Sequence, residues 1–146
     1  MEPDAYKMKM RVIWIGKTKN PQLAKLCDDY TGRIRHFLPL EIAEIKPEKL
    51  LATIETTDRV IALDPKGKTW SSEQFAKVLH QHMATDSRRL TLVIGDYNGL
   101  PQQLKNRADT LWSFSTLTFT HDMTRVLLLE QIYRALSIIH NFPYSK

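Results

Sequence analysis

The chain has 146 residues, of which 42% are hydrophobic and 25% are charged, as expected for a globular domain with a sizeable core. No apolar run approaches the ~20 residues that span a bilayer, the N-terminus lacks the apolar segment of a secretory signal, and the single cysteine excludes an internal disulfide. Lysine and arginine outnumber aspartate and glutamate by 21 to 16, and the formal charge of +5 suits a polyanionic partner without identifying one. We therefore expect a cytoplasmic protein, with residues 1–7 as a loose polar leader and residues 8–146 as one domain.

The first part of the chain predicts a strand, a helix and a second strand. Residues 10–16, MRVIWIG, form a short apolar run that is typical of a buried strand. Asn20 as N-cap and Pro21 at the first helical position predict a helix over residues 20–37. Residues 40–45 alternate apolar and polar side chains, which indicates a half-exposed strand.

The middle of the chain continues this alternation. Pro47 begins a short predicted helix over residues 47–56. Residues 59–64, RVIALD, predict a third strand, which the turn 65–68 closes. Residues 71–83 begin with a serine cap and carry apolar side chains at helical spacing, so they predict another helix.

The last part of the chain begins with an apolar run over 90–95, which predicts a buried strand ending in a tight loop. Residues 101–111 predict a polar helix, residues 112–119 a strand or strand pair, and residues 120–142 a long final helix. Strands that alternate with helices indicate an α/β domain with a mainly parallel sheet.

The predicted final helix has almost no polar face. A helix that is apolar all round must be covered on all sides. In so short a chain, the economical arrangement places one side on the sheet and the other on a second copy of the chain, which predicts a homodimer. A helix buried deeply within a monomer is the alternative.

The sequence contains none of the common nucleotide-binding, serine-hydrolase or zinc-protease motifs. His80 and His82 are two residues apart on a predicted helix, so they point in different directions, and we expect both at the surface. His36 and His140 lie near predicted helix ends, where structural roles are usual, and Cys27 is expected to be a core thiol. We therefore predict no metal site.

Three predicted strand ends carry small or turn-forming residues, in the segments ALDPKGK, VIGDYNG and FSTLTFTHD. Ligands of open parallel sheets bind at the carboxyl ends of the strands, so these segments are candidates to surround one ligand. Taken alone, the spacing of Gly95 and Gly99 is more often that of a plain turn. Arg134 follows Glu130 by four residues in the apolar final helix. It is either a simple ion-pair partner of Glu130 or a phosphate clamp or cross-subunit contact.

Taken in order, the segments LDPKGK, VIGDYNGL, WSFSTLTFTHDMTRVLLLEQIYRA and NFPYSK resemble the pseudouridine N3-methyltransferases of large-subunit rRNA in the SPOUT (α/β-knot) superfamily. The resemblance begins near Met8 and is densest from residue 90 onward. It implies a Rossmann-like, mainly parallel sheet whose C-terminal part forms a trefoil knot, in a single domain. It also implies S-adenosylmethionine as cofactor, a homodimer, and a pseudouridine in helix 69 of 23S rRNA as substrate, within assembled ribosomes and without a metal.

The resemblance also implies site residues by matching position. Arg134, Tyr144 and Lys146 match the functional arginine and the C-terminal tail of the family, and we expect them to serve catalysis or to bind flanking phosphates. The positions that match the cofactor site are Leu63, Gly95, Asp96, Gly99, Ser115, Thr116, Leu117, Thr118, Phe119 and Thr120.

The chain departs from the family pattern at two of these positions and at one residue between two others. Asp96 stands where a second glycine is usual, Thr120 where a proline is usual, and Ser145 where a histidine is usual. Aspartate tolerates a left-handed backbone better than most residues, and Thr120 is suited to cap the final helix. Two alternatives to an active enzyme of this kind therefore stay open. One is a knotted dimer that binds RNA or ribosomes without transferring methyl groups, and the other is a related methyltransferase with a different RNA target.

Overall fold

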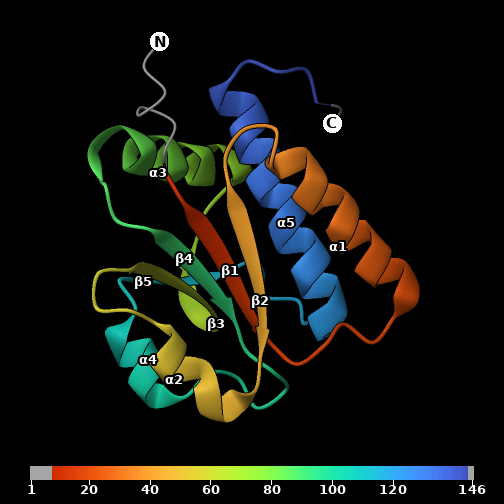
Figure 1. The fold of residues 1–146 in the computed structure, drawn as a ribbon, viewed down its shortest axis with the longest axis vertical. Coiled ribbons are helices and arrows are strands. Elements are labelled where there is room, and N and C mark those ends of the chain that lie inside the picture. The colour runs from red at the N-terminus through yellow and green to blue at the C-terminus, as the bar shows by residue number, and fades with distance from the viewer. Residues whose placement is uncertain (1–7, 145–146) are drawn as a thin grey trace.

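The computed structural model describes residues 8–144 and contains one five-stranded sheet in which every strand pair is parallel. The strand order is β2-β1-β4-β3-β5, as Figure 1 shows. The strands are β1 (Met10–Ile15), β2 (Leu40–Ile45), β3 (Arg59–Thr69), β4 (Leu90–Ile94) and β5 (Thr110–Ser113). The helices are α1 (Pro21–Ile34), α2 (Leu50–Thr53) after a 3₁₀ turn (Pro47–Lys49), α3 (Ser72–Thr85), α4 (Gln102–Arg107) and α5 (His121–Ile139). The predicted α/β class with a parallel sheet is confirmed.

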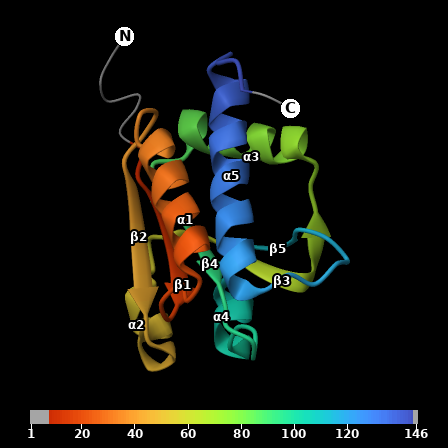
Figure 2. The same cartoon turned by 90° about the vertical axis from the view of Figure 1, so that its right-hand side faces the viewer.

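Both faces of the sheet are covered, because successive side chains of a strand point to opposite faces. In β1, Val12 and Trp14 join the core formed with α1, α3 and α5, whereas Ile13 and Ile15 join the core formed with α2 and α4. α1 and α5 lie side by side on the first face (Figures 1 and 2). Strands buried on both sides explain the continuous apolar runs in the sequence.

The helix caps follow the sequence signals. The Asn20 side chain accepts hydrogen bonds from the backbone N–H groups of Gln22 and Leu23, and Ser71 forms a capping box with Gln74 at the start of α3. Thr120 caps α5 by accepting from the N–H of Met123. The predicted caps are therefore confirmed.

Two predicted boundaries near the ligand edge are wrong. The segment 65–68 is no turn, because β3 continues through it to Thr69 with a shift in its pairing to β5 between Leu63 and Lys68. Gly67 permits this pairing, since an added Cβ would collide with the backbone of Leu111. The predicted strand over 112–119 is also wrong, because β5 ends at Ser113 and residues 114–120 are irregular. The shortened helix α4 frees Thr110 and Leu111 for β5.

α5 is covered largely within one chain. It contacts α1, α3 and β4, and seven apolar side chains from Val126 to Leu136 are buried there. Met123 and Ile138 remain exposed near its two ends. The composition of α5 therefore does not by itself require a partner, and the homodimer stays a prediction. Within the described residues, no helix is long and apolar enough to cross a membrane.

His82 is buried, which corrects the expectation that it lies at the surface. Its ring nitrogens lie 3.1 Å from Arg59 Nη1 and 2.9 Å from the carbonyl oxygen of Arg88, so α3 is tied to the amino ends of β3 and β4. His82 follows Leu79 by three residues and so lies on the same, buried face of α3. His80 is exposed, as predicted, and Cys27 is a buried thiol whose pKa is raised to about 11 by burial.

The buried imidazole should make stability depend on pH. Burial lowers the pKa of His82 below its ordinary value of 6.5, so the unfolded chain binds a proton that the folded chain resists. This contribution to stability is complete above the unfolded pKa and is lost as pH falls toward the folded pKa. Between about pH 6.5 and 5 we expect a loss of at most about 1.4 kcal/mol per pH unit, measured by urea unfolding. A His82→Gln variant should lose this dependence, while His36→Gln should retain it; an unchanged slope in His82→Gln would contradict the assignment.

Candidate active site

A cavity of about 510 Å³ opens where β4 and β5 end, beside the middle of β3 and the first turn of α5. Three chain segments that are far apart in the sequence form its walls. They are residues 63–65 of β3, the loop 94–99 after β4, and the segment 112–119 that leads to α5, whose His121 and Thr124 complete the lining. The three strand ends expected to surround one ligand therefore meet at one cavity.

Nine of the ten expected cofactor positions line this cavity. They are Leu63, Gly95, Asp96, Gly99, Ser115, Thr116, Leu117, Thr118 and Phe119. Thr120 is the exception, since its hydroxyl caps α5 and accepts from the N–H of Met123 at 3.2 Å. The structure places these residues at the cavity wall, and their roles in binding the cofactor stay predictions.

The loop after β4 is a tight turn that brings two backbone segments together. The N–H of Gly99 donates to the carbonyl oxygen of Asp96 at 2.8 Å, and Gly99 has a φ of +77°. An ideal Cβ on Gly95 would lie 2.8 Å from the carbonyl group of Gly99, which is too close for any side chain. The sequence therefore needs glycine at both positions to form this wall.

Asp96 supports the turn from within. Its Oδ1 accepts the N–H of Asn98 at 2.9 Å, which is the hydrogen bond of an Asx turn. Gly16 and Gly99, and Asn141 as the one non-glycine residue, have a positive φ among residues 8–144, so Asp96 has an ordinary backbone. Asp96 therefore does not adopt the left-handed conformation that aspartate tolerates, and the loop accommodates it without backbone strain.

The segment before α5 holds its irregular path through its own side chains. Ser113 donates to the carbonyl oxygen of Ser115 at 3.2 Å, and the Ser115 hydroxyl accepts the N–H of Leu117 at 3.0 Å. Behind it, Trp112 stacks on Phe75 with ring centroids 4.5 Å apart. Local hydroxyl bonds and a buried aromatic anchor therefore replace the strand that the sequence predicted.

Several lining residues were missed at the sequence level. They are Asp64, Pro65, Ile94, Tyr97, Trp112, Ser113, Phe114, His121 and Thr124. Six of them lie within the three strand-end segments that the sequence indicated, although no role was assigned to them individually. Trp112, Ser113 and Thr124 lie outside those segments, and Thr124 joins the lining only through the direction of the first turn of α5.

The cavity is compatible in size and lining with S-adenosylmethionine. Its volume lies within the range of small-molecule sites, about 300–1,000 Å³, and its apolar walls suit an adenine ring. Two carboxylates, Asp64 and Asp96, line it and favour a cationic ligand. Asp64 is also paired with Lys105 across 3.5 Å. Among residues 8–144, the indole N–H of Trp112 is buried and has no hydrogen-bond partner.

The expected catalytic residues form a separate cluster. Arg134 Nη2 donates to Glu130 Oε2 at 2.9 Å, the Tyr144 hydroxyl donates to the same oxygen at 2.9 Å, and the Arg134 guanidinium lies 4.9 Å from the centroid of the Tyr144 ring. Burial, with hydrogen bonds to Tyr30 and Glu130, raises the pKa of Tyr144, so its hydroxyl stays protonated at neutral pH. Lys146 lies outside the described residues.

The catalytic cluster and the cavity lie at different places along α5. Thr124 is the last cavity-lining residue, and Arg134 follows it by ten positions, about 15 Å along the helix axis. One chain therefore does not bring Arg134 and Tyr144 together with the cavity.

A family model described as predicted SPOUT methyltransferase matches residues 8–145. The chain belongs to the SPOUT methyltransferase family. Relatives named ribosomal RNA large subunit methyltransferase H support this assignment. The protein from Geobacter sulfurreducens is 39% identical and aligns over 94% of this chain and 99% of its own. That from Solibacter usitatus is also 39% identical, over 95% of this chain and 100% of its own.

Solved structures show the SPOUT methyltransferase fold at low sequence identity. A probable methylase family protein from Haemophilus influenzae has a TM-score of 0.62 at 9% identity, covering 94% of this chain and 70% of that one. The SpoU methyltransferase AviRb from Streptomyces viridochromogenes, solved with AdoMet, has a TM-score of 0.52 at 12% identity, covering 91% and 61%. The family model and the relatives confirm the expected family, and the solved structures confirm the fold class. The trefoil knot stays a prediction.

Proposed function

We propose that this SPOUT family member transfers a methyl group from S-adenosylmethionine to N3 of a pseudouridine in helix 69 of 23S rRNA. The observation that carries the proposal is the meeting of nine expected cofactor positions at one cavity. The name of these relatives, ribosomal RNA large subunit methyltransferase H, supports the class of substrate. Because such a substrate lies in ribosomes, we also propose that the protein works in the cytoplasm.

The side chains have distinct tasks in this proposal. S-adenosylmethionine supplies a methyl group that its sulfonium has already activated, so the protein mainly positions the reactants. Asp64 and Asp96 place negative charge in the cavity, which favours a cationic cofactor over its neutral product. Arg134 stabilises the uracil ring after N3 loses its proton, and Lys146 binds a neighbouring phosphate. Tyr144 orients Arg134 through the ring contact and the shared oxygen of Glu130.

The distance between the cavity and Arg134 supports a homodimer whose active site takes residues from both copies. Apolar side chains are exposed around the cavity mouth, where Tyr97 is 84% and Leu117 69% accessible, with Phe119 and Met123 beside them. Isolated exposed apolar residues are normal, but a group at the mouth of a site indicates a contact surface. A second copy seated there would cover this group and bring its own Arg134 and Tyr144 to the cavity.

Asp96 is the main argument for the alternative of an RNA-binding dimer without methyl transfer. Its ordinary backbone and its hydrogen bond to Asn98 favour an open, working loop over a blocked one. A related enzyme with another RNA target would share this cavity, and mapping the methylated nucleotide distinguishes it.

A mixed dimer tests the shared site. Gly95→Val disables the cavity and Arg134→Ala the catalytic cluster, so each variant alone should lose most methyl transfer to ribosomes. A purified heterodimer of the two variants, carrying different affinity tags, has one site free of both substitutions. We expect it to recover about half of the wild-type rate per dimer, since one of its two sites is intact. No recovery would show that cavity and Arg134 act within one chain.

A further inference from the structure

The loop between β1 and α1, residues 16–20, is fastened to α5 by two side chains that the cavity does not use. Arg125 is 2% exposed and donates to the carbonyl oxygen of Ile15 at 2.7 Å and to the Thr18 hydroxyl at 2.9 Å. Asp122 Oδ2 accepts the N–H groups of Lys19 at 3.0 Å and Asn20 at 2.9 Å. These four hydrogen bonds therefore fix the end of β1 and the short loop that follows it.

This fastening is costly in physical terms. The guanidinium of Arg125 lies 5.0 Å from the centroid of the Trp14 ring, and burial lowers the pKa of Arg125. Among the residues that the structure describes, its Nε has no hydrogen-bond partner. Buried charges of this kind often stabilise a fold less than apolar residues of the same size would. What Arg125 provides in this structure is a fixed backbone path for the loop.

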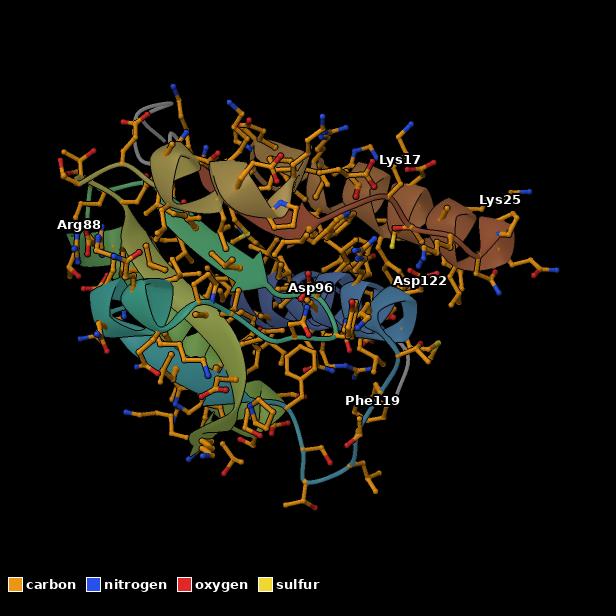
Figure 3. All side chains as sticks on the ribbon, turned by 90° about the horizontal axis from the view of Figure 1, so that it is seen from below. Lys17, Lys25, Arg88, Asp96, Phe119 and Asp122 are labelled. Carbon is orange, nitrogen blue, oxygen red and sulfur yellow. The ribbon has the colours of Figure 1, made fainter. Side chains whose placement is uncertain are left out.

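The loop and the beginning of α1 carry positive charge only. Residues 16–26, GKTKNPQLAKL, contain Lys17, Lys19 and Lys25 and no acidic residue. All three lysines are exposed. Figure 3 shows Lys17 and Lys25 pointing away from the body of the protein on the side of Asp122, whereas Arg88 lies at the other end of this view.

The loop lies close to the cavity through the first turn of α5. His121 and Thr124 line the cavity, and Asp122 and Arg125, the next residue in each case, hold the loop. The two sets therefore lie on neighbouring faces of the same helical turn, about 100° apart around its axis. If one nucleotide of an RNA occupied the cavity, its neighbouring nucleotides would lie within reach of the lysines.

We propose that the β1–α1 loop is a phosphate-binding element for the RNA, in which Lys17 and Lys19 contact phosphates that flank the target nucleotide. Lysine is suited to this task, because it binds phosphate as a point charge on a flexible stem and needs no fixed donor geometry. Asp122 and Arg125 act as positioning residues, since they hold the loop and do not meet the RNA. The inference rests on the proposed function for the identity of the substrate.

The double variant Lys17→Gln/Lys19→Gln tests the contact. Lys9→Gln/Lys77→Gln is the matched control, since it removes the same charge from two exposed lysines away from the loop. Lys9 precedes β1, and Lys77 lies in α3. We expect the loop variant to raise the KM for ribosomes about tenfold, to leave kcat and the Kd for S-adenosylmethionine unchanged, and to lower the salt slope of RNA affinity by about two. The control should change none of these by more than about twofold. Equal effects of the two double variants would overturn the proposal.

A second variant tests the fastening. Asp122→Ala removes a negative charge, so electrostatics alone would strengthen RNA binding. A loosened loop predicts weaker binding, with rescue by Asp122→Asn, whose side-chain oxygen still accepts the backbone N–H groups. Stronger binding by Asp122→Ala would overturn the positioning role.

Direct binding of the protein to a 23S rRNA fragment is measured in parallel for all variants. If the wild-type protein fails to transfer methyl groups, the proposed function fails, and the binding data still decide the role of the loop. If transfer occurs and the loop variants bind RNA like the wild type, the loop proposal alone is wrong.

Discussion

Replacing Gly95 with valine is expected to lower the affinity for S-adenosylmethionine by about a hundredfold or more. The reason is steric, because even the first carbon of a side chain would lie 2.8 Å from the carbonyl group of Gly99 and 3.1 Å from Leu100 Cγ. The backbone of the loop 96–99 would have to move, and that loop is one wall of the cavity. Calorimetric titration of wild-type and variant protein with S-adenosylmethionine measures the effect.

The same substitution at Gly32 is the control for Gly95→Val. Gly32 lies in α1, and a Cβ built there meets no atom within 4 Å. Gly32→Val should bind the cofactor like the wild type, and circular dichroism shows whether each variant is folded. If Gly95→Val proves unfolded, Gly95→Ala makes the same test with a smaller displacement. Unchanged affinity in a folded Gly95 variant would mean that the cofactor does not occupy this cavity.

Replacing Asp58 with alanine should produce the largest loss of stability, about 3–5 kcal/mol. Asp58 is 1% exposed and accepts from Arg11 at 3.0 Å, from Arg89 at 3.0 and 3.3 Å, and from the N–H of Glu55 at 2.9 Å. Burial alone would raise the pKa of Asp58, but the hydrogen bonds from Arg89 and Glu55 and the nearby guanidinium charges lower it below its ordinary value. Without this carboxylate, Arg11 is left as a buried charge without its anionic partner.

Urea unfolding at neutral pH measures this loss. Asp29→Ala removes an exposed ion pair with Arg33 at 3.3 Å and should cost no more than about 0.5 kcal/mol. A loss below about 1 kcal/mol for Asp58→Ala would show that the network at the amino ends of β1, β3 and β4 contributes little to stability.

The regular elements of this fold were predictable because their signals are local. β1, β3 and β4 begin where their apolar runs indicated, and β2 begins where the alternation of apolar and polar side chains indicated. The helix caps at Asn20 and Ser71 are where the sequence placed them. Burial on both faces makes such runs long and continuous, which distinguishes them from amphipathic helices.

The errors share a non-local cause. The extension of β3 through residues 65–68 depends on β5, which lies more than 40 residues further along the chain and approaches closely only because Gly67 has no side chain. The burial of His82 depends on Arg59 and on the backbone of Arg88, neither of which a helical pattern reveals. In both cases, contacts with residues distant in the sequence determine the local structure.

The candidate site was predictable mainly through ordered motifs. The resemblance named nine cavity-lining positions, but local patterns alone suggested only that three strand ends surround a ligand. The sequence left the role of Arg134 undecided between an ion pair and a phosphate clamp or cross-subunit contact. The structure contains the ion pair with Glu130 and the contact to Tyr144. The separation of this cluster from the cavity needed coordinates, because a helix sequence does not show which end faces a site.

Transfer of labelled methyl groups from S-adenosylmethionine to purified bacterial ribosomes that lack this modification tests the central claim most directly. The rRNA is then digested, and the labelled nucleoside is identified by mass and position. The account predicts one methyl group per large subunit, on N3 of a pseudouridine in helix 69, by the wild-type protein with its native Asp96. No transfer by the wild-type protein, or transfer only by an Asp96→Gly variant, would contradict it, and the reading of an RNA-binding dimer without catalysis would replace it.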